Sequence, residues 1–105
     1  MNKIKIPKSF YLHGQKIKIE FNNNLRNLEN DVGQADYRQS KIILQPIEKG
    51  YPNNEQLEQI FLHELIHHIL DHMGKIDLRN NDEFIDLFAN LLHQAFQTAE
   101  YDTKD

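Results

Sequence analysis

The fold of this chain is decided by residues 61–70, which read Phe61-Leu62-His63-Glu64-Leu65-Ile66-His67-His68-Ile69-Leu70. Apolar side chains recur there at the three- and four-residue spacing of an α-helix that buries one broad face. Upstream, Asn53 or Asn54 can cap such a helix, and downstream Gly74 can end it after Met73. The sequence therefore predicts a helix from residue 53 or 54 to residue 73.

A second helix is expected from Asn80 or Asn81 to about Tyr101. Its apolar residues again follow the helical period, in an arc that includes Leu87 and Leu91. Polar residues occupy the opposite side of this helix. The tail that follows, residues 102–105, is expected to be frayed.

The first half of the chain has the pattern of β-strands. Ile17, Ile19 and Phe21 alternate with polar residues, after a Gly-containing break at residues 13–15 that predicts a hairpin. A second hairpin is expected around residues 39–40. The expected fold is a single α+β domain over residues 1–105, in which a small antiparallel sheet from residues 1–46 packs on a two-helix hairpin from residues 53–101.

Composition limits the chemistry that the chain can perform. It has no cysteine, so any metal site must use His, Asp or Glu, and six histidines is a high number for 105 residues. The net charge of −4 argues against nucleic acid as a partner. The N-terminus lacks the apolar stretch of a signal peptide, and no run approaches the roughly 18 apolar residues of a membrane span. The sequence therefore predicts a cytoplasmic protein with no membrane contact.

The central helix carries the pattern His-Glu-x-x-His. His63 and His67 are four residues apart, so their imidazoles project from the same side of a helix and can bind one zinc ion. Glu64 lies at the edge of that face, where it can act as a general base without binding the metal. The alternative is a chance pair of surface histidines. His68 and His72 form a second pair without an adjoining acid, and we expect them to border the cleft or face solvent.

A catalytic zinc site needs a third protein ligand, and the second helix is its expected source. A third histidine ten positions after the first would fit the metzincin spacing, but Met73 stands there. The polar side of the second helix offers Glu83, Asp86 and His93 as alternatives. Glu83 has a competing structural role, because it can close a capping box three residues after Asn80.

The motif together with Asp86-Leu87-Phe88-Ala89-Asn90 resembles the small ImmA/IrrE-type gluzincins of phages and mobile elements. In that family a Glu-x-x-Ala-Asn/Asp segment on the following helix supplies the third ligand. The resemblance implies a zincin-like fold with Asp86 as that ligand, where the family usually has Glu, and Asn90 near the metal. It also implies a regulatory protein as substrate. Residues 33–38 resemble the stretch ahead of the motif helix in phage members.

Supporting groups around the metal can also be proposed from the sequence. Metal-bound histidines usually donate their second N–H to an oxygen, and Asn90 and Asp71 are candidates to receive it. An oxyanion formed during hydrolysis needs a further donor. The candidates for that role are Tyr37, Arg38, His68 and His93.

These features favour a zinc-dependent metallopeptidase that hydrolyses a peptide bond of a protein or peptide substrate. Such a substrate would lie extended, pairing with residues 41–45 as an edge strand. The first alternative is a non-catalytic, zinc-stabilised protein-interaction module. The second is an interaction protein without metal.

Overall fold

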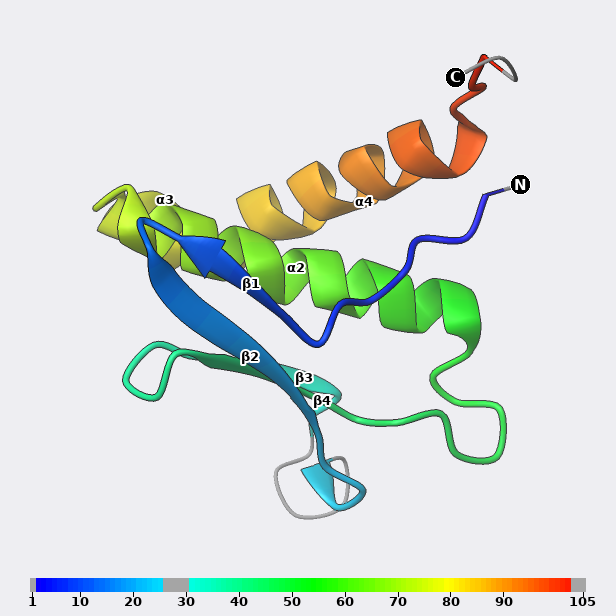
Figure 1. Ribbon diagram of the computed structural model, residues 1–105, viewed down its shortest axis with the longest axis horizontal. Helices are drawn as coiled ribbons and strands as arrows, with labels where there is room; N and C mark the ends of the chain where they lie inside the picture. The colour runs from blue at the N-terminus through cyan, green and yellow to red at the C-terminus, as the bar shows by residue number, and fades with distance from the viewer. Residues whose placement is uncertain (1, 26–30, 103–105) are drawn as a thin grey trace.

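The computed structural model describes residues 2–25 and 31–102, and its strands and helices form three layers (Figure 1). A four-stranded sheet makes the first layer, a central helix the second and another helix the third, on the far side from the sheet. The elements in chain order are β1 (Ser9–Leu12), β2 (Gln15–Phe21), β3 (Gly33–Asp36), β4 (Lys41–Leu44), α2 (Asn54–His72), α3 (Ile76–Arg79) and α4 (Asp82–Thr98). The predicted α+β class is thus confirmed.

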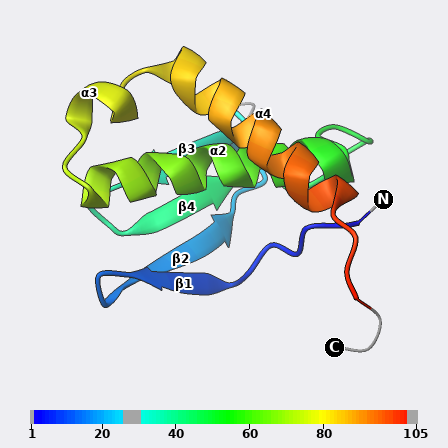
Figure 2. The same cartoon turned by 90° about the horizontal axis from the view of Figure 1, so that it is seen from above.

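The sheet has the strand order β1-β2-β4-β3 (Figure 2). Both predicted hairpins are present, since β1 pairs antiparallel with β2 and β3 pairs antiparallel with β4. The two hairpins join through a parallel pairing of β2 with β4. The prediction of a purely antiparallel sheet is therefore wrong, because the long connection after β2 lets β4 enter the sheet alongside it in the same direction.

Strand β4 lies inside the sheet, which corrects the prediction that residues 41–45 form an edge. Its side chains Ile42 and Leu44 are completely buried. An interior position, with neighbours on both sides, is what such an apolar strand requires. Strand β3 forms this edge of the sheet instead. Its sequence, Gly-Gln-Ala-Asp, is more polar than the Lys-Ile-Ile-Leu sequence of β4.

Helix α2 begins and ends close to where the sequence predicts. Asn53 accepts a hydrogen bond from the Gln56 amide, and the Gln56 side chain accepts one from the Asn53 amide, which completes a capping box. At the other end Gly74 adopts φ +72°, and its amide donates to the carbonyl of Asp71. The amide of Lys75 donates to the carbonyl five residues earlier, so the helix closes with a Schellman motif.

Both sides of α2 are buried, because the sheet covers one and α4 covers the other. Ile66 and Leu70 of α2 belong to the same buried cluster as Ile17 of β2 and Ile85 of α4. The helix therefore buries several of its polar residues along with its apolar ones, namely Glu58, Glu64 and His68.

Helix α4 is capped by Asn81, whose side chain accepts a hydrogen bond from the Phe84 amide. It ends at Thr98, three residues before the predicted end at Tyr101, because Ala99 is already extended. The short helix α3 was not predicted. Of the expected tail, residue 102 follows α4 without regular structure, and residues 103–105 lie outside the described part of the chain.

The face that α4 turns inward differs from its predicted apolar arc. Its buried residues are Ile85, Ala89 and His93, whereas Leu87 and Leu91 of the arc are 62% and 58% exposed. Because α4 is the outer layer, it packs mainly on α2, along one narrow stripe. Among the described residues, no helix has the length and apolar character needed to span a bilayer.

Candidate metal centre

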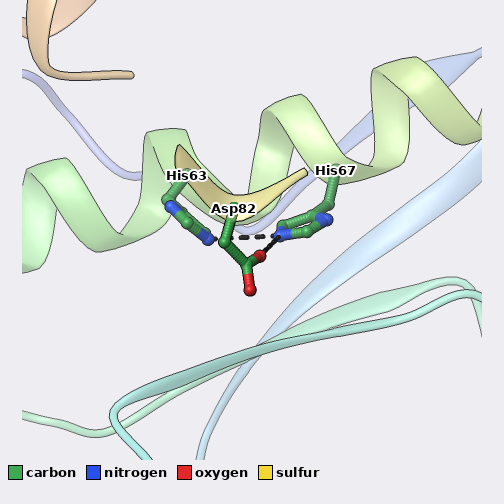
Figure 3. Close-up of side chains that lie close together, drawn as sticks. All are labelled: His63, His67 and Asp82. Atoms are coloured by element: carbon green, nitrogen blue, oxygen red, sulfur yellow. Dashed lines mark hydrogen bonds and ion pairs between the residues drawn. The ribbon is translucent and has the colours of Figure 1, made fainter. Parts of the chain in front are cut away.

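His63 and His67 project from the same face of α2 toward the first turn of α4, and both are half-buried (Figure 3). Their Nε2 atoms lie 3.1 Å apart. Two nitrogens that bind one tetrahedral zinc ion at 2.0–2.1 Å lie about 3.3–3.4 Å from each other. The paired imidazoles therefore fit a single zinc ion with little movement of either ring.

The other nitrogen of each ring already has a partner. His63 Nδ1 lies 2.7 Å from Asp86 Oδ1, and His67 Nδ1 lies 3.1 Å from the hydroxyl of Tyr37. A proton on each Nδ1 leaves the Nε2 lone pairs directed at the shared position between the rings. Burial, and next the neighbouring His63, lower the pKa of His67, which favours the neutral imidazole that binds metals.

A carboxylate of α4 completes the possible ligand set, and it belongs to Asp82. Asp82 Oδ1 lies 3.7 Å from His67 Nε2, and one ligand atom from each of His63, His67 and Asp82 lies within 4.8 Å of the others (Figure 3). Asp82 was not among the ligands predicted from the sequence. The sequence could have indicated it, because Asp82 lies four residues before Asp86 and therefore on the same side of α4.

The structure gives Asp86 a different place from the one expected of the third ligand. Its carboxylate contacts the nitrogen of His63 that faces away from the shared position. Glu83, the alternative ligand, is exposed on the first turn of α4 and is not part of the group. The expected capping box with Asn80 is also absent, because Asn81 is the cap.

Glu64 lies against strand β3, where its side chain is nearly closed off from solvent at 7% exposure. Burial raises its pKa to about 8, and the negative charges of Asp31, Asp82 and Asp86 act in the same direction. Gly33 makes this close approach possible. A Cβ atom there would come within 2.5 Å of Ile60 Cγ2 and 2.9 Å of Glu64 Oε2.

A cavity of about 760 Å³ opens over these groups, between β3, the motif helix and the start of α4. Five carboxylates face it together with one arginine, so the cavity is acidic overall. Its lining consists of Asp31, Gly33, Gln34, Ala35, Asp36, Tyr37, Arg38, His63, Glu64, His67, Asp82 and Asp86.

Two residues predicted to support the histidines have other environments. Asp71 pairs with Arg79, whose Nη1 lies 2.7 Å from its Oδ1. The same arginine lies 4.6 Å above the ring of Tyr37, so Asp71 is linked to this tyrosine through Arg79. Asn90 is exposed and lines a smaller cavity beside Asp86.

Of the four candidates for stabilising an oxyanion, only Tyr37 and Arg38 line the main cavity. Burial raises the pKa of Tyr37 to about 12, so its phenol stays protonated. His68 is buried, with Nε2 2.9 Å from the Lys41 carbonyl. His93 is buried between the helices with Nε2 2.9 Å from Glu58 Oε1, which removes it as an oxyanion donor and as a third ligand.

An α+β domain with paired imidazoles, a buried glutamate between them and a carboxylate from the next helix has the composition of a metallopeptidase-type centre. The model of the SprT-like family matches residues 3–102. The chain therefore belongs to the SprT-like family, whose members are zinc metallopeptidase-like proteins. This match supports the predicted class but not the finer resemblance to ImmA/IrrE-type peptidases. No curated protein and no solved structure matches the chain.

Proposed function

We propose that this protein is a zinc-dependent metallopeptidase that uses the His-Glu-x-x-His motif to hydrolyse a peptide bond. The observation that carries the proposal is the placement of Glu64, a buried carboxyl group, on the wall of the cavity that also holds the paired Nε2 atoms. His63, His67 and a carboxylate at the start of α4 would hold the ion. When bound, zinc supplies Lewis-acid chemistry by polarising a carbonyl group and lowering the pKa of water.

Glu64 is the proposed general base and then general acid. It accepts a proton from the attacking water and delivers it to the leaving nitrogen. A base needs a pKa near the working pH, and burial moves the pKa of Glu64 in that direction, to about 8. The carboxylate becomes the more populated form once a cation is held nearby, since an opposite charge favours ionisation.

Tyr37 has two proposed roles. If the Nδ1–H of His67 donates to the phenol oxygen, the phenol proton is free to point into the cavity that this residue lines. It can then donate a hydrogen bond to an oxyanion, and its high pKa keeps that proton in place. Arg79, above the ring, holds the tyrosine in position.

The substrate would be a protein or peptide segment in extended form. We place it along β3, since this strand comes last in the described sheet order and its residues line the cavity. The acidic lining favours neutral or basic residues near the scissile bond. The resemblance to ImmA/IrrE-type peptidases supports a regulatory protein of a phage or mobile element as the substrate.

The general test compares wild type with Glu64→Gln and His63→Ala on a quenched fluorescent peptide library, using protein without a histidine tag. Glu64→Gln should bind as much zinc as the wild type and lose turnover, whereas His63→Ala should lose both turnover and the zinc held by the His63 and His67 pair. Full turnover in Glu64→Gln refutes the mechanism.

The third ligand is tested by Asp82→Asn and Asp86→Asn. As the ligand, Asp82 should account for the larger loss of zinc affinity, whereas Asp86, which orients His63, should cost about 10- to 100-fold. The opposite order would return the ligand role to Asp86, as the ImmA/IrrE resemblance implies.

The alternative of a non-catalytic, zinc-stabilised module predicts unfolding on chelation. The core between the sheet, α2 and α4 is built from apolar side chains. We therefore expect the far-UV circular dichroism spectrum to survive excess EDTA at 25 °C, and its loss would favour the module.

A further inference from the structure

A second pair of imidazoles lies where the first hairpin meets the end of the motif helix. His13 is in the turn between β1 and β2, and His72 is the last residue of α2. Their Nδ1 atoms are 3.3 Å apart, and their rings lie 5.3 Å apart at an angle of 48°. The fold thus brings together two histidines that are 59 positions apart in the chain.

The distance between these nitrogens fits a shared metal ion. It equals the spacing of about 3.3–3.4 Å that two ligands of one tetrahedral zinc ion adopt. It is also close to the 3.1 Å between the Nε2 atoms of His63 and His67. Within residues 2–25 and 31–102, the structure shows no other hydrogen-bonding partner for the ring nitrogens of His13 or His72.

The position of His72 also favours a cation. His72 belongs to the last turn of α2, where the helix dipole attracts positive charge. His13 has φ 53° and Gly14 has φ 76°, so both residues of the turn are left-handed. His, like Asn and Asp, is enriched at such left-handed positions, so Asn can replace His13 there without straining the turn.

The site is separate from the candidate metal centre. His72 follows His67 by five residues, which places it about 140° further around the helix. His68 is not available as an additional ligand, because its Nε2 contacts the carbonyl of Lys41.

We propose that His13 and His72 form a second site for a divalent transition-metal ion, which fastens the β1–β2 turn to the end of α2. Imidazole nitrogens suit zinc, nickel and copper, and water would complete the coordination. The inference does not depend on peptidase activity.

The test measures nickel binding by equilibrium dialysis of metal-free protein without a histidine tag. Wild type should bind two equivalents, and His13→Asn and His72→Gln should each bind one. The double variant His63→Ala/His67→Ala should also bind one, and adding His13→Asn to it should abolish binding. Asn keeps the left-handed turn accessible, so His13→Asn should fold with an unchanged far-UV circular dichroism spectrum.

A second measurement separates a bridge between two elements from adventitious binding. In the His63→Ala/His67→Ala background, nickel should raise the Tm and slow hydrogen exchange of the β1–β2 amides, and His13→Asn should remove both effects. Lys16→Ala, on the same hairpin, serves as the matched control and should retain them. Only one equivalent bound by wild type, or a second equivalent that persists in His13→Asn, overturns the proposal.

Discussion

Replacing Glu64 with Gln should stabilise the metal-free protein, and the gain should grow with pH. Burial, together with Asp31, Asp82 and Asp86, raises the pKa of Glu64 from 4.5 to about 8 in the folded chain. The folded state therefore holds this proton more tightly than the unfolded state does. That contribution to stability is complete below pH 4.5 and is lost as the pH rises from 4.5 through 8. Gln has no proton to lose, so the variant avoids the loss.

The magnitude follows from the pKa shift. Each pH unit between the unfolded and folded pKa values corresponds to about 1.4 kcal/mol. Between pH 5.5 and pH 8.5 the wild type should lose about 3 kcal/mol of its free energy of unfolding relative to Glu64→Gln. Glu64 is only 7% exposed, so solvent screens this effect little.

Urea denaturation at pH 5.5 and pH 8.5 in excess EDTA, followed by circular dichroism, measures the difference. EDTA is needed because a bound cation would lower the pKa of Glu64. Histidines titrate in both proteins, so they largely cancel in the comparison. Glu55→Gln, on the exposed first turn of the same helix, controls for the loss of one negative charge. An equal stability difference at both pH values would show that Glu64 is not held in a desolvated, acidic environment.

Four further substitutions test the packing and the site. Gly33→Ala should cost about 1–3 kcal/mol in urea denaturation, because the new Cβ overlaps the helix beside Glu64; an unchanged midpoint would contradict the close approach. Ile85→Ala should cost about 2–5 kcal/mol, because the side chain is completely buried. Leu91→Ala, on the outer face of α4, should change stability by less than about 0.5 kcal/mol. If Leu91→Ala cost as much as Ile85→Ala, the face of α4 that carries Leu91 would have to be buried. Tyr37→Phe should lower zinc affinity about 10- to 100-fold in a chelator competition, and unchanged affinity would show that the phenol does not orient its histidine.

Local patterns in the sequence were enough to predict the motif helix and both hairpins. Asn53 and Gly74 act on the backbone within a few residues, so the limits of α2 follow from nearby hydrogen bonds. The alternation of apolar and polar residues likewise identifies strand β2 without reference to the rest of the chain. The approach of the His63 and His67 side chains follows from the same helical geometry, because residues four apart share a face.

The pairing of distant segments could not be predicted in the same way. The position of β4 between β2 and β3 depends on which edges of the sheet find partners, and a strand's own sequence does not contain that information. The exposed Leu91 and the buried His93 on α4 show the same limit. Periodicity gives the direction of the apolar arc, whereas the place of the helix in the third layer decides which part of it is covered.

By itself, the sequence determined the chemistry that is available: two imidazoles and a carboxyl group within five residues of one helix, and no thiol anywhere in the chain. The tertiary structure decided which residues from other elements lie beside the imidazoles and the carboxyl group. It set Asp82 rather than Asp86 near the shared position of the rings, and it placed Gly33 against the glutamate. The physical reason is the distance along the chain over which each kind of interaction acts. Helical geometry fixes neighbours within a turn, whereas contacts between layers depend on how all the buried side chains pack together.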